Sequence, residues 1–191
     1  SGDGCGILFK IPEFFFRSIA NEEKINIAKN FAIGMFFLNV DANKRKSSIK
    51  IIEKVISESG FSLAGWRDVP TDKSICGEDA LKTLPYIAQA FINPPEKLDA
   101  KDIESRLSVI RRKIEILVSK EKDETFYITS FSSKVILYKG MIMPKHLSKF
   151  YLDLSNEKLE TSLCVFHQRF STNTTPQWSL AQPFRMLAHN G

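Results

Sequence analysis

The stretch Phe31-Ala32-Ile33-Gly34-Met35-Phe36-Phe37-Leu38 carries no charged or hydrogen-bonding side chain over its whole length. These eight residues, three of them Phe, have the length and aromatic content of a β-strand that is buried on both faces. We therefore predict that this strand lies inside a sheet, and that the surrounding elements supply an apolar layer on each side of it.

The segments around this strand show strand and helix patterns in mixed order. The clearest helix lies downstream, where Ile103, Leu107, Ile110, Ile114 and Leu117 recur at steps of four and three residues and form one apolar face. Turn residues, alternation and capping signals predict the remaining elements: strands over 4–11 and 61–66, helices over 21–30, 47–59 and 145–153, a β-hairpin from 125–130 and 134–138, and a strand over 162–167. This order indicates an α+β or layered α/β architecture.

The helix over 47–59 has signals at both ends. Ser47 or Ser48 can cap its start, and Gly60 stands where a left-handed residue ends many helices. The basic cluster of residues 44–46 precedes it, and we interpret that cluster as a solvated turn.

Length and composition describe an ordinary globular domain. The chain has 191 residues, 43% hydrophobic and 26% charged, which suits one domain and disfavours disorder. Its net charge of +5 is spread among neighbouring acids and bases, and no nucleic-acid signature accompanies it. The run 31–38 is far shorter than the roughly 20 residues that span a bilayer. We expect neither a nucleic-acid nor a membrane partner.

The cysteines and the first residues bear on the compartment. Three cysteines, an odd number, argue against a disulfide framework. The first residues show no signal-peptide pattern. Together these features favour a reducing, intracellular compartment.

Side chains able to do chemistry gather in the last 25 residues. His167, Arg169 and the hydroxyl and amide groups of residues 168–174 follow an apolar strand, where binding residues are often carried. A Ser/Thr/Asn-rich turn explains the same composition equally well. Asn190-Gly191 is the strongest short hairpin signal, but an Asn amide and a Gly N–H can also form an oxyanion hole.

A family resemblance rests on motifs spread along the whole chain. They are Gly2-Asp3-Gly4-x-Gly6-Ile7-Leu8, Gly65-Trp66-Arg67-Asp68-Val69-Pro70, Tyr138-Lys139-Gly140-Met141, Phe150-Tyr151-x-Asp153-Leu154, His167 to Thr174, Pro176-x-Trp178-x-Leu180-Ala181-Gln182-Pro183-Phe184-Arg185 and Leu187-Ala188-His189-Asn190-Gly191. In this order they resemble the class II glutamine amidotransferase domain of the glutamate synthase large subunit. The segments 65–70 and 181–185 favour glutamate synthase over asparagine- or purine-pathway amidotransferases.

The resemblance implies a fold and an activity. The fold is the N-terminal-nucleophile hydrolase type, an αββα sandwich of the α+β class, and residues 1–191 are expected to be a single partial domain, incomplete at both ends. Enzymes of this family hydrolyse L-glutamine to glutamate and ammonia through a cysteine thioester. The ammonia passes to a synthase domain of the same polypeptide, which aminates 2-oxoglutarate.

The resemblance also assigns roles to individual residues. Arg169 is implied to grip the substrate α-carboxylate and Thr172 to contact the substrate through its hydroxyl. Asn190 and Gly191 are implied to form the oxyanion hole, while His167 and His189 beside them are interpreted as structural.

The sequence does not directly identify the nucleophile. Mature enzymes of this family begin with a cysteine whose own α-amine serves as base. Cys5-Gly6-Ile7-Leu8 looks like such a start. We interpret Cys5 as a decoy in a small, buried position, because the family places this segment a few dozen residues after its N-terminal cysteine. Cys76 and Cys164 are not candidates either, and Cys164 is expected in the core. The fragment alone is then expected to be inactive.

Cofactors and partners follow from the resemblance too. FMN and an iron–sulfur cluster are implied for other parts of the full-length enzyme and none for this segment, which has neither clustered cysteines nor a G-x-G-x-x-G loop. A small NAD(P)H-oxidising subunit or ferredoxin is an implied partner. The implied location is the cytoplasm, with the plastid as the alternative. The alternative of another class is a non-catalytic, amidotransferase-like binding module.

Overall fold

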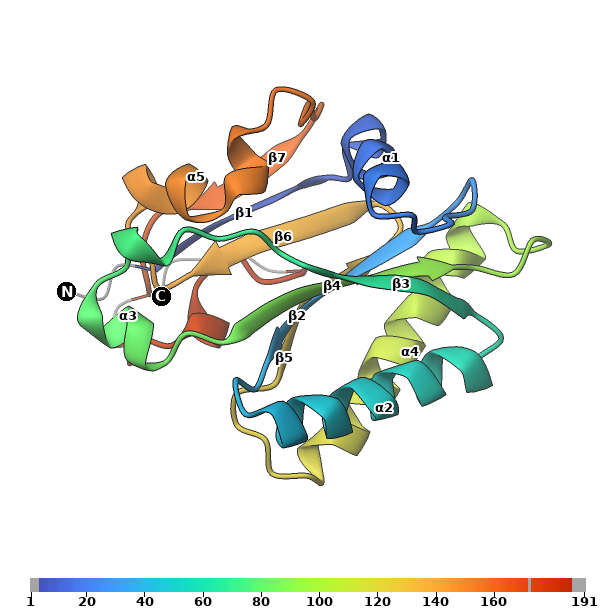
Figure 1. The fold of residues 1–191 in the computed structure, drawn as a ribbon, viewed down its shortest axis with the longest axis horizontal. Coiled ribbons are helices and arrows are strands. Elements are labelled where there is room, and N and C mark those ends of the chain that lie inside the picture. The colour runs from blue at the N-terminus through green and yellow to red at the C-terminus, as the bar shows by residue number, and fades with distance from the viewer. Residues whose placement is uncertain (1–3, 172, 187–191) are drawn as a thin grey trace.

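Two antiparallel sheets form the centre of the protein. A computed structural model describes residues 4–171 and 173–186 (Figure 1). Sheet A has the strand order β6-β1-β7, and sheet B the order β3-β4-β2-β5. The strands are β1 (Cys5–Lys10), β2 (Ala32–Leu38), β3 (Ser62–Asp68), β4 (Tyr86–Asn93), β5 (Tyr127–Ser132), β6 (Val135–Gly140) and β7 (Cys164–His167).

The apolar run over residues 31–38 forms the interior strand that the sequence predicts. All of β2 is buried, and it pairs with β4 on one side and β5 on the other. Phe36 packs toward a layer of two helices, whereas Met35 and Phe37 pack toward sheet A. The prediction of a strand buried on both faces is confirmed.

The two helices α2 (Ala42–Glu58) and α4 (Ala100–Ser119) cover the outer face of sheet B (Figure 1). The apolar face predicted for α4 is buried, apart from the partly buried Leu117. Gly60 adopts φ 78°, the left-handed conformation predicted for it.

The start of α2 differs from the prediction. Asp41, not Ser47 or Ser48, caps the helix by accepting from the backbone N–H of Asn43 and of Lys44, each at 2.9 Å. Residues 44–46 therefore lie in the first turns of the helix and do not form a separate turn. A carboxylate at the N-cap satisfies two amides that would otherwise lack partners, so the helix extends back to it.

Two further helical predictions need correction. The helix near the N-terminus is α1 (Glu13–Glu22), directly after Pro12, and residues 25–30 are not helical. Its buried side chains include Phe15, Phe16 and Ile19, which anchor it on the core. The region 145–153 is broken into short pieces, namely a 3-10 turn over Pro144–His146, α5 (Leu147–Phe150) and a 3-10 turn over Leu152–Ser155. The strand β4, the 3-10 turn over Lys73–Ile75 and α3 (Glu78–Lys82) are additional to the predicted elements.

The strands β5 and β6 exist where the hairpin was predicted, but they belong to different sheets. Between them, hydroxyl side chains replace part of a backbone ladder. Thr129 donates to the carbonyls of Leu137 at 3.0 Å and Met35 at 3.3 Å, and Ser130 accepts from the Leu137 N–H at 3.1 Å. The connection therefore carries the chain from sheet B into sheet A.

The sheets pack face to face through an apolar core. Phe9 and Tyr138 of sheet A meet Met35, Phe37 and Phe91 of sheet B in one buried cluster. The described part of the fold is thus a layer of helices, sheet B and sheet A, which confirms the α+β class. None of the described helices is long and apolar enough to cross a membrane.

A buried polar network crosses this core. Arg67 on β3 bonds to both carboxylate oxygens of Asp153, at 2.7 and 2.8 Å, and to Gln89 of β4 at 2.8 Å. Tyr138 on β6 donates to the same carboxylate at 2.8 Å. Because both sheets contribute, the network fixes their relative position.

Candidate functional site

One end of sheet A gathers the segments that carry the sequence motifs. Strand pairing places Cys5, the first residue of β1, beside Gly140, the last of β6, and Gly6 beside His167, the last of β7. Arg169 follows two residues later. The motifs that contain Cys5, Gly140 and His167 are far apart in the sequence. They nevertheless meet at one end of sheet A, which is called the edge of sheet A below.

Arg169 lies exposed just beyond the end of β7. Among the described residues its guanidinium makes no hydrogen bond or ion pair. The next residue is held, because the Phe170 ring covers Gly4 so closely that a Cβ there would come within 2.4 Å of it. The backbone beside Arg169 is thus anchored, and its side chain lies exposed at the end of β7.

A second segment, residues 178–186, is anchored beside the first. Trp178 is buried against Gly140, where a Cβ would come within 2.3 Å of the ring, and its Nε1 donates to the Ala80 carbonyl at 3.1 Å. The Gln182 amide donates to the Ser171 hydroxyl. These contacts bind the loop after β7 to the segment that leads toward residues 187–191.

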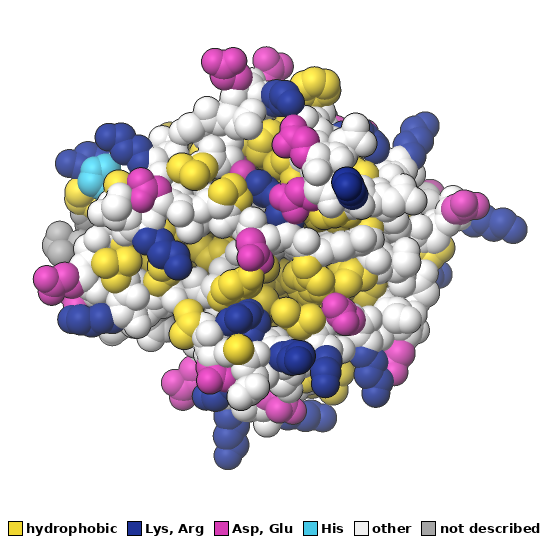
Figure 2. Space-filling model, in the orientation of Figure 1, with side chains coloured by type: hydrophobic (Ala, Val, Ile, Leu, Met, Phe, Trp, Pro, Cys, Tyr) yellow, Lys and Arg dark blue, Asp and Glu magenta, His cyan; other side chains and the backbone are white. Residues whose placement is uncertain are grey.

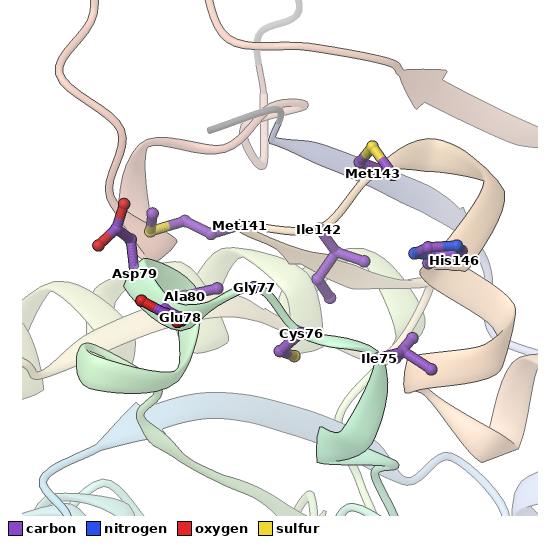
Figure 3. A pocket seen from close by; sticks show the side chains of 10 residues that line it. All are labelled: Ile75, Cys76, Gly77, Glu78, Asp79, Ala80, Met141, Ile142, Met143 and His146. Atoms are coloured by element: carbon purple, nitrogen blue, oxygen red, sulfur yellow. The ribbon is translucent and has the colours of Figure 1, made fainter. Parts of the chain in front are cut away.

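A cavity of about 520 Å³ opens beside the segment that follows β6 (Figure 3). Two segments line it, residues 75–80 and residues 141–146, and the former contribute Cys76. Burial, followed by the nearby Asp72 charge, raises the pKa of the Cys76 thiol. A thiol that holds its proton is a poor nucleophile, so Cys76 is not an activated group.

The other two cysteines occupy opposite environments. Cys5 is 1% exposed within the core between the sheets, which suits a small packing residue. Cys164 was expected in the core, but it is exposed, as are three of the four residues of β7, because among the described residues no element covers this strand. The apolar appearance of β7 is misleading for the same reason: Phe166 is 63% exposed.

Several predicted site residues lie outside the described part of the chain. Thr172, His189, Asn190 and Gly191 are among them, so their roles stay predictions, as do those of Arg169 and Cys5. His167 is partly buried at the end of β7.

The described residues do not fit a metal or an iron–sulfur cluster. Within residues 4–171 and 173–186 no group of three or more His, Cys, Asp or Glu side chains could hold a metal ion. On the face shown in Figure 2, basic and acidic side chains are interspersed, so this face shows no large patch of one charge sign.

Sequence reasoning missed one polar residue at this edge of sheet A. Lys139 is fully buried on β6, between Tyr138 and Gly140. The signal was present, because a lysine in an otherwise apolar strand is either at an edge or has special partners. Its partners are described below.

Comparison with known proteins adds an independent finding. A family model described as "Glutamine amidotransferases class-II" matches residues 1–191. The chain is 39% identical over 194 residues to the chloroplastic ferredoxin-dependent glutamate synthase of Oryza sativa subsp. japonica. It is 40% identical over 193 residues to the large chain of the NADPH glutamate synthase of Azospirillum brasilense, and 41% identical over 199 residues to the ferredoxin-dependent glutamate synthase of Cyanidium caldarium. All of this chain is covered, but only 12% or 13% of each relative.

Proposed function

Because this chain belongs to the class II glutamine amidotransferases, we propose that it forms part of the glutamine-hydrolysing domain of a glutamate synthase large chain. The match to glutamate synthases over the full chain supports this assignment. The observation that carries it furthest is the exposed guanidinium of Arg169, anchored through Phe170 at the edge where the motif segments meet.

The proposed reaction is the hydrolysis of the glutamine side-chain amide. Arg169 binds the substrate α-carboxylate through two parallel N–H···O bonds, and the Thr172 hydroxyl makes a further contact. A cysteine thiolate attacks the amide carbon, and the oxyanion that forms accepts from the Asn190 amide and the Gly191 N–H. The C–N bond breaks, ammonia leaves with the proton taken from the thiol, and water then hydrolyses the thioester to glutamate.

The nucleophile in this proposal is not one of the three cysteines of the chain. Cys5 lies within the core, Cys76 keeps its proton, and Cys164 is on the outer strand β7. We propose instead the N-terminal cysteine that the family uses, on a strand completing an αββα sandwich. The helix layer and the two packed sheets support that fold.

The proposed partners belong to the rest of the enzyme. Ammonia passes to a synthase domain, where 2-oxoglutarate is aminated with electrons from ferredoxin or a NAD(P)H-oxidising subunit. FMN and an iron–sulfur cluster belong to those parts. The names of the plant relatives favour a plastid as the location, with cytoplasm as the alternative.

The test uses the intact glutamate synthase that contains this chain. Arg169→Ala is expected to lower kcat/KM for glutamine by about 100-fold, since a charge-assisted pair of hydrogen bonds contributes roughly 3 kcal/mol. Turnover with added ammonia, which bypasses this site, should be unchanged. Arg106→Ala, at an exposed position on α4, is the matched control.

The outcomes separate the hypotheses. An unchanged KM for glutamine in Arg169→Ala contradicts the carboxylate role. A wild-type enzyme that uses ammonia but releases none from glutamine supports the alternative, a non-catalytic binding module.

A further inference from the structure

Lys139 is buried in a place where a lysine is costly. It lies on β6 with no solvent exposure. Its neighbours in the strand, Tyr138 and Ile136, belong to the core between the sheets, and successive side chains in a strand point to opposite faces. Lys139 therefore lies on the other face of β6 from Tyr138, where segment 178–186 and Tyr127 of β5 cover its amine.

The Lys139 amine has one close hydrogen-bond acceptor. Its Nζ donates to the Ser179 carbonyl at 2.6 Å and more weakly to the Tyr127 hydroxyl at 3.3 Å. The rings of Tyr127 and Phe184 stand over it, with centroids 4.4 and 4.9 Å from Nζ. Two rings and a carbonyl thus form a cup around the amine.

No carboxylate of the described residues pairs with this amine. The acidic group of the surrounding network is Glu115 on α4, which bonds to Arg111 at 2.8 Å and to Arg185 at 3.3 Å. Arg185 in turn lies over the Tyr127 ring at 5.4 Å. The groups that face Lys139 from the neighbouring elements are therefore Tyr127, which is neutral, and the cation Arg185.

This environment disfavours a charged amine. Burial, and secondarily Arg185, lowers the pKa of Lys139 from 10.5 to about 6. Ring faces attract a cation, but removal from water without a carboxylate outweighs that attraction. At pH 7 Lys139 is mostly an uncharged hydrogen-bond donor.

The acceptor belongs to a segment that leads to the proposed active site. Ser179 lies in the 3-10 turn Trp178–Leu180. Farther along, the Gln182 carbonyl packs tightly on Gly6. A Cβ added to Gly6 would come within 2.7 Å of the Gln182 carbonyl oxygen and within 2.6 Å of the Cβ of Lys139. Asn190 and Gly191 follow in the sequence.

We propose that Lys139 is a positioning residue for glutamine hydrolysis: its amine holds the Ser179 carbonyl and so anchors segment 178–186, which leads in the sequence to the proposed oxyanion donors Asn190 and Gly191. This inference rests on the proposed function. It gives β6 a role in catalysis without contact between Lys139 and substrate.

A matched pair of variants in the intact enzyme tests it. Met and Gln are similar in size, but only Gln keeps an uncharged N–H donor. We expect Lys139→Met to lower kcat with glutamine by about 10- to 100-fold, the effect of displacing a catalytic group by about 1 Å. KM should stay within about threefold, because oxyanion donors act in the transition state. Lys139→Gln should recover most of kcat, and Lys134→Met, an exposed lysine before β6, should behave as wild type.

The wild-type enzyme supplies a second measurement that needs no variant. Below about pH 6 the amine gains a charge that no carboxylate of the described residues neutralises, and we expect this charge to weaken the packing of segment 178–186 around it. Glutamine-dependent turnover should then fall relative to turnover with ammonia, measured at a constant concentration of NH₃. Lys139→Gln should lack this fall.

Each result decides the inference. Equal kcat values for the Met and Gln variants, a raised KM with unchanged kcat, or the same acid fall in Lys139→Gln overturns it. If Lys139→Met also loses ammonia-dependent turnover, the substitution has damaged the whole enzyme. The comparison of the pH profiles of the wild type and Lys139→Gln then decides the inference. Absence of glutamine hydrolysis in the wild type refutes the proposed function instead.

Discussion

Removal of the Asp153 carboxylate is expected to destabilise the protein through the network that joins the two sheets. Asp153 is 4% exposed and accepts three hydrogen bonds, two from Arg67 at 2.7 and 2.8 Å and one from Tyr138 at 2.8 Å. In Asp153→Ala, Arg67 stays buried at 6% exposure and keeps only Gln89 at 2.8 Å and the half-exposed Glu23 at 3.2 Å.

The magnitude follows from these contacts. Breaking a buried ion pair by removing one partner costs about 3–5 kcal/mol, and the two contacts that Arg67 retains favour the lower end. The Tyr138 hydroxyl loses its acceptor, which adds about 1 kcal/mol. We expect a loss of about 4 kcal/mol in the free energy of unfolding, or roughly 8–16 °C in Tm for a chain of this size.

Urea unfolding measures the effect, with the fluorescence of Trp66 and Trp178 as the signal. The double variant Arg67→Met/Asp153→Ala should lose at least about 2 kcal/mol less than the sum of the single changes, because no charge is then left buried. Asp79→Ala, whose side chain is 86% exposed, is the control and should cost under about 0.5 kcal/mol. Additive single and double changes, or a cost under about 1 kcal/mol for Asp153→Ala, would contradict a role of this network in stability.

Four other outcomes are expected, three of them from single substitutions. In the intact enzyme Cys5→Ala should keep glutamine turnover within about threefold, since a buried packing residue is replaced by a smaller one; the 191-residue chain alone should release no ammonia from glutamine in the same assay. Gly140→Ala should lower stability in urea by about 1–3 kcal/mol, because its Cβ would come within 2.3 Å of the Trp178 ring; an unchanged midpoint contradicts that packing. Lys139→Met should unfold at higher urea than wild type at pH 6.5, with a smaller difference at pH 9. The folded-state pKa of Lys139 lies below its unfolded value, so the unfolded chain binds more protons between about pH 6 and 10 and the stability of the wild type rises with pH.

Local sequence patterns predicted the elements whose signal is contained in one segment. The face of α4 and the conformation of Gly60 are of this kind. The predicted start of α2 was wrong, because Asp41 caps the helix and neither Ser47 nor Ser48 does. The strand β4 was not predicted, because it carries the polar Gln89 in its centre. Gln89 can be buried there because it forms hydrogen bonds with Arg67 and Tyr138, which belong to two other strands.

The residues of the candidate site also differ in whether the sequence alone could identify them. Arg169 could be selected from the sequence because its motif is long and specific, and the resemblance that the motif carries agrees with the family match. Lys139 could not be assigned a role, because its acceptor at Ser179 and its rings at Tyr127 and Phe184 come from distant segments. Neither could the shared edge of sheet A, since strand pairing alone brings Cys5, Gly140 and His167 together.

The family, the α+β class and the interior position of the strand over 31–38 could all be predicted from the amino-acid sequence. The sequence did not determine which other apolar strand would be exposed: residues 162–167 look almost as apolar, yet β7 ends sheet A with Phe166 facing solvent. The hydrophobicity of a strand shows what it can bury, whereas the number of its neighbours depends on how the whole chain packs. The same distinction explains Lys139, whose charge is set by the groups that tertiary structure places around it and not by its own side chain.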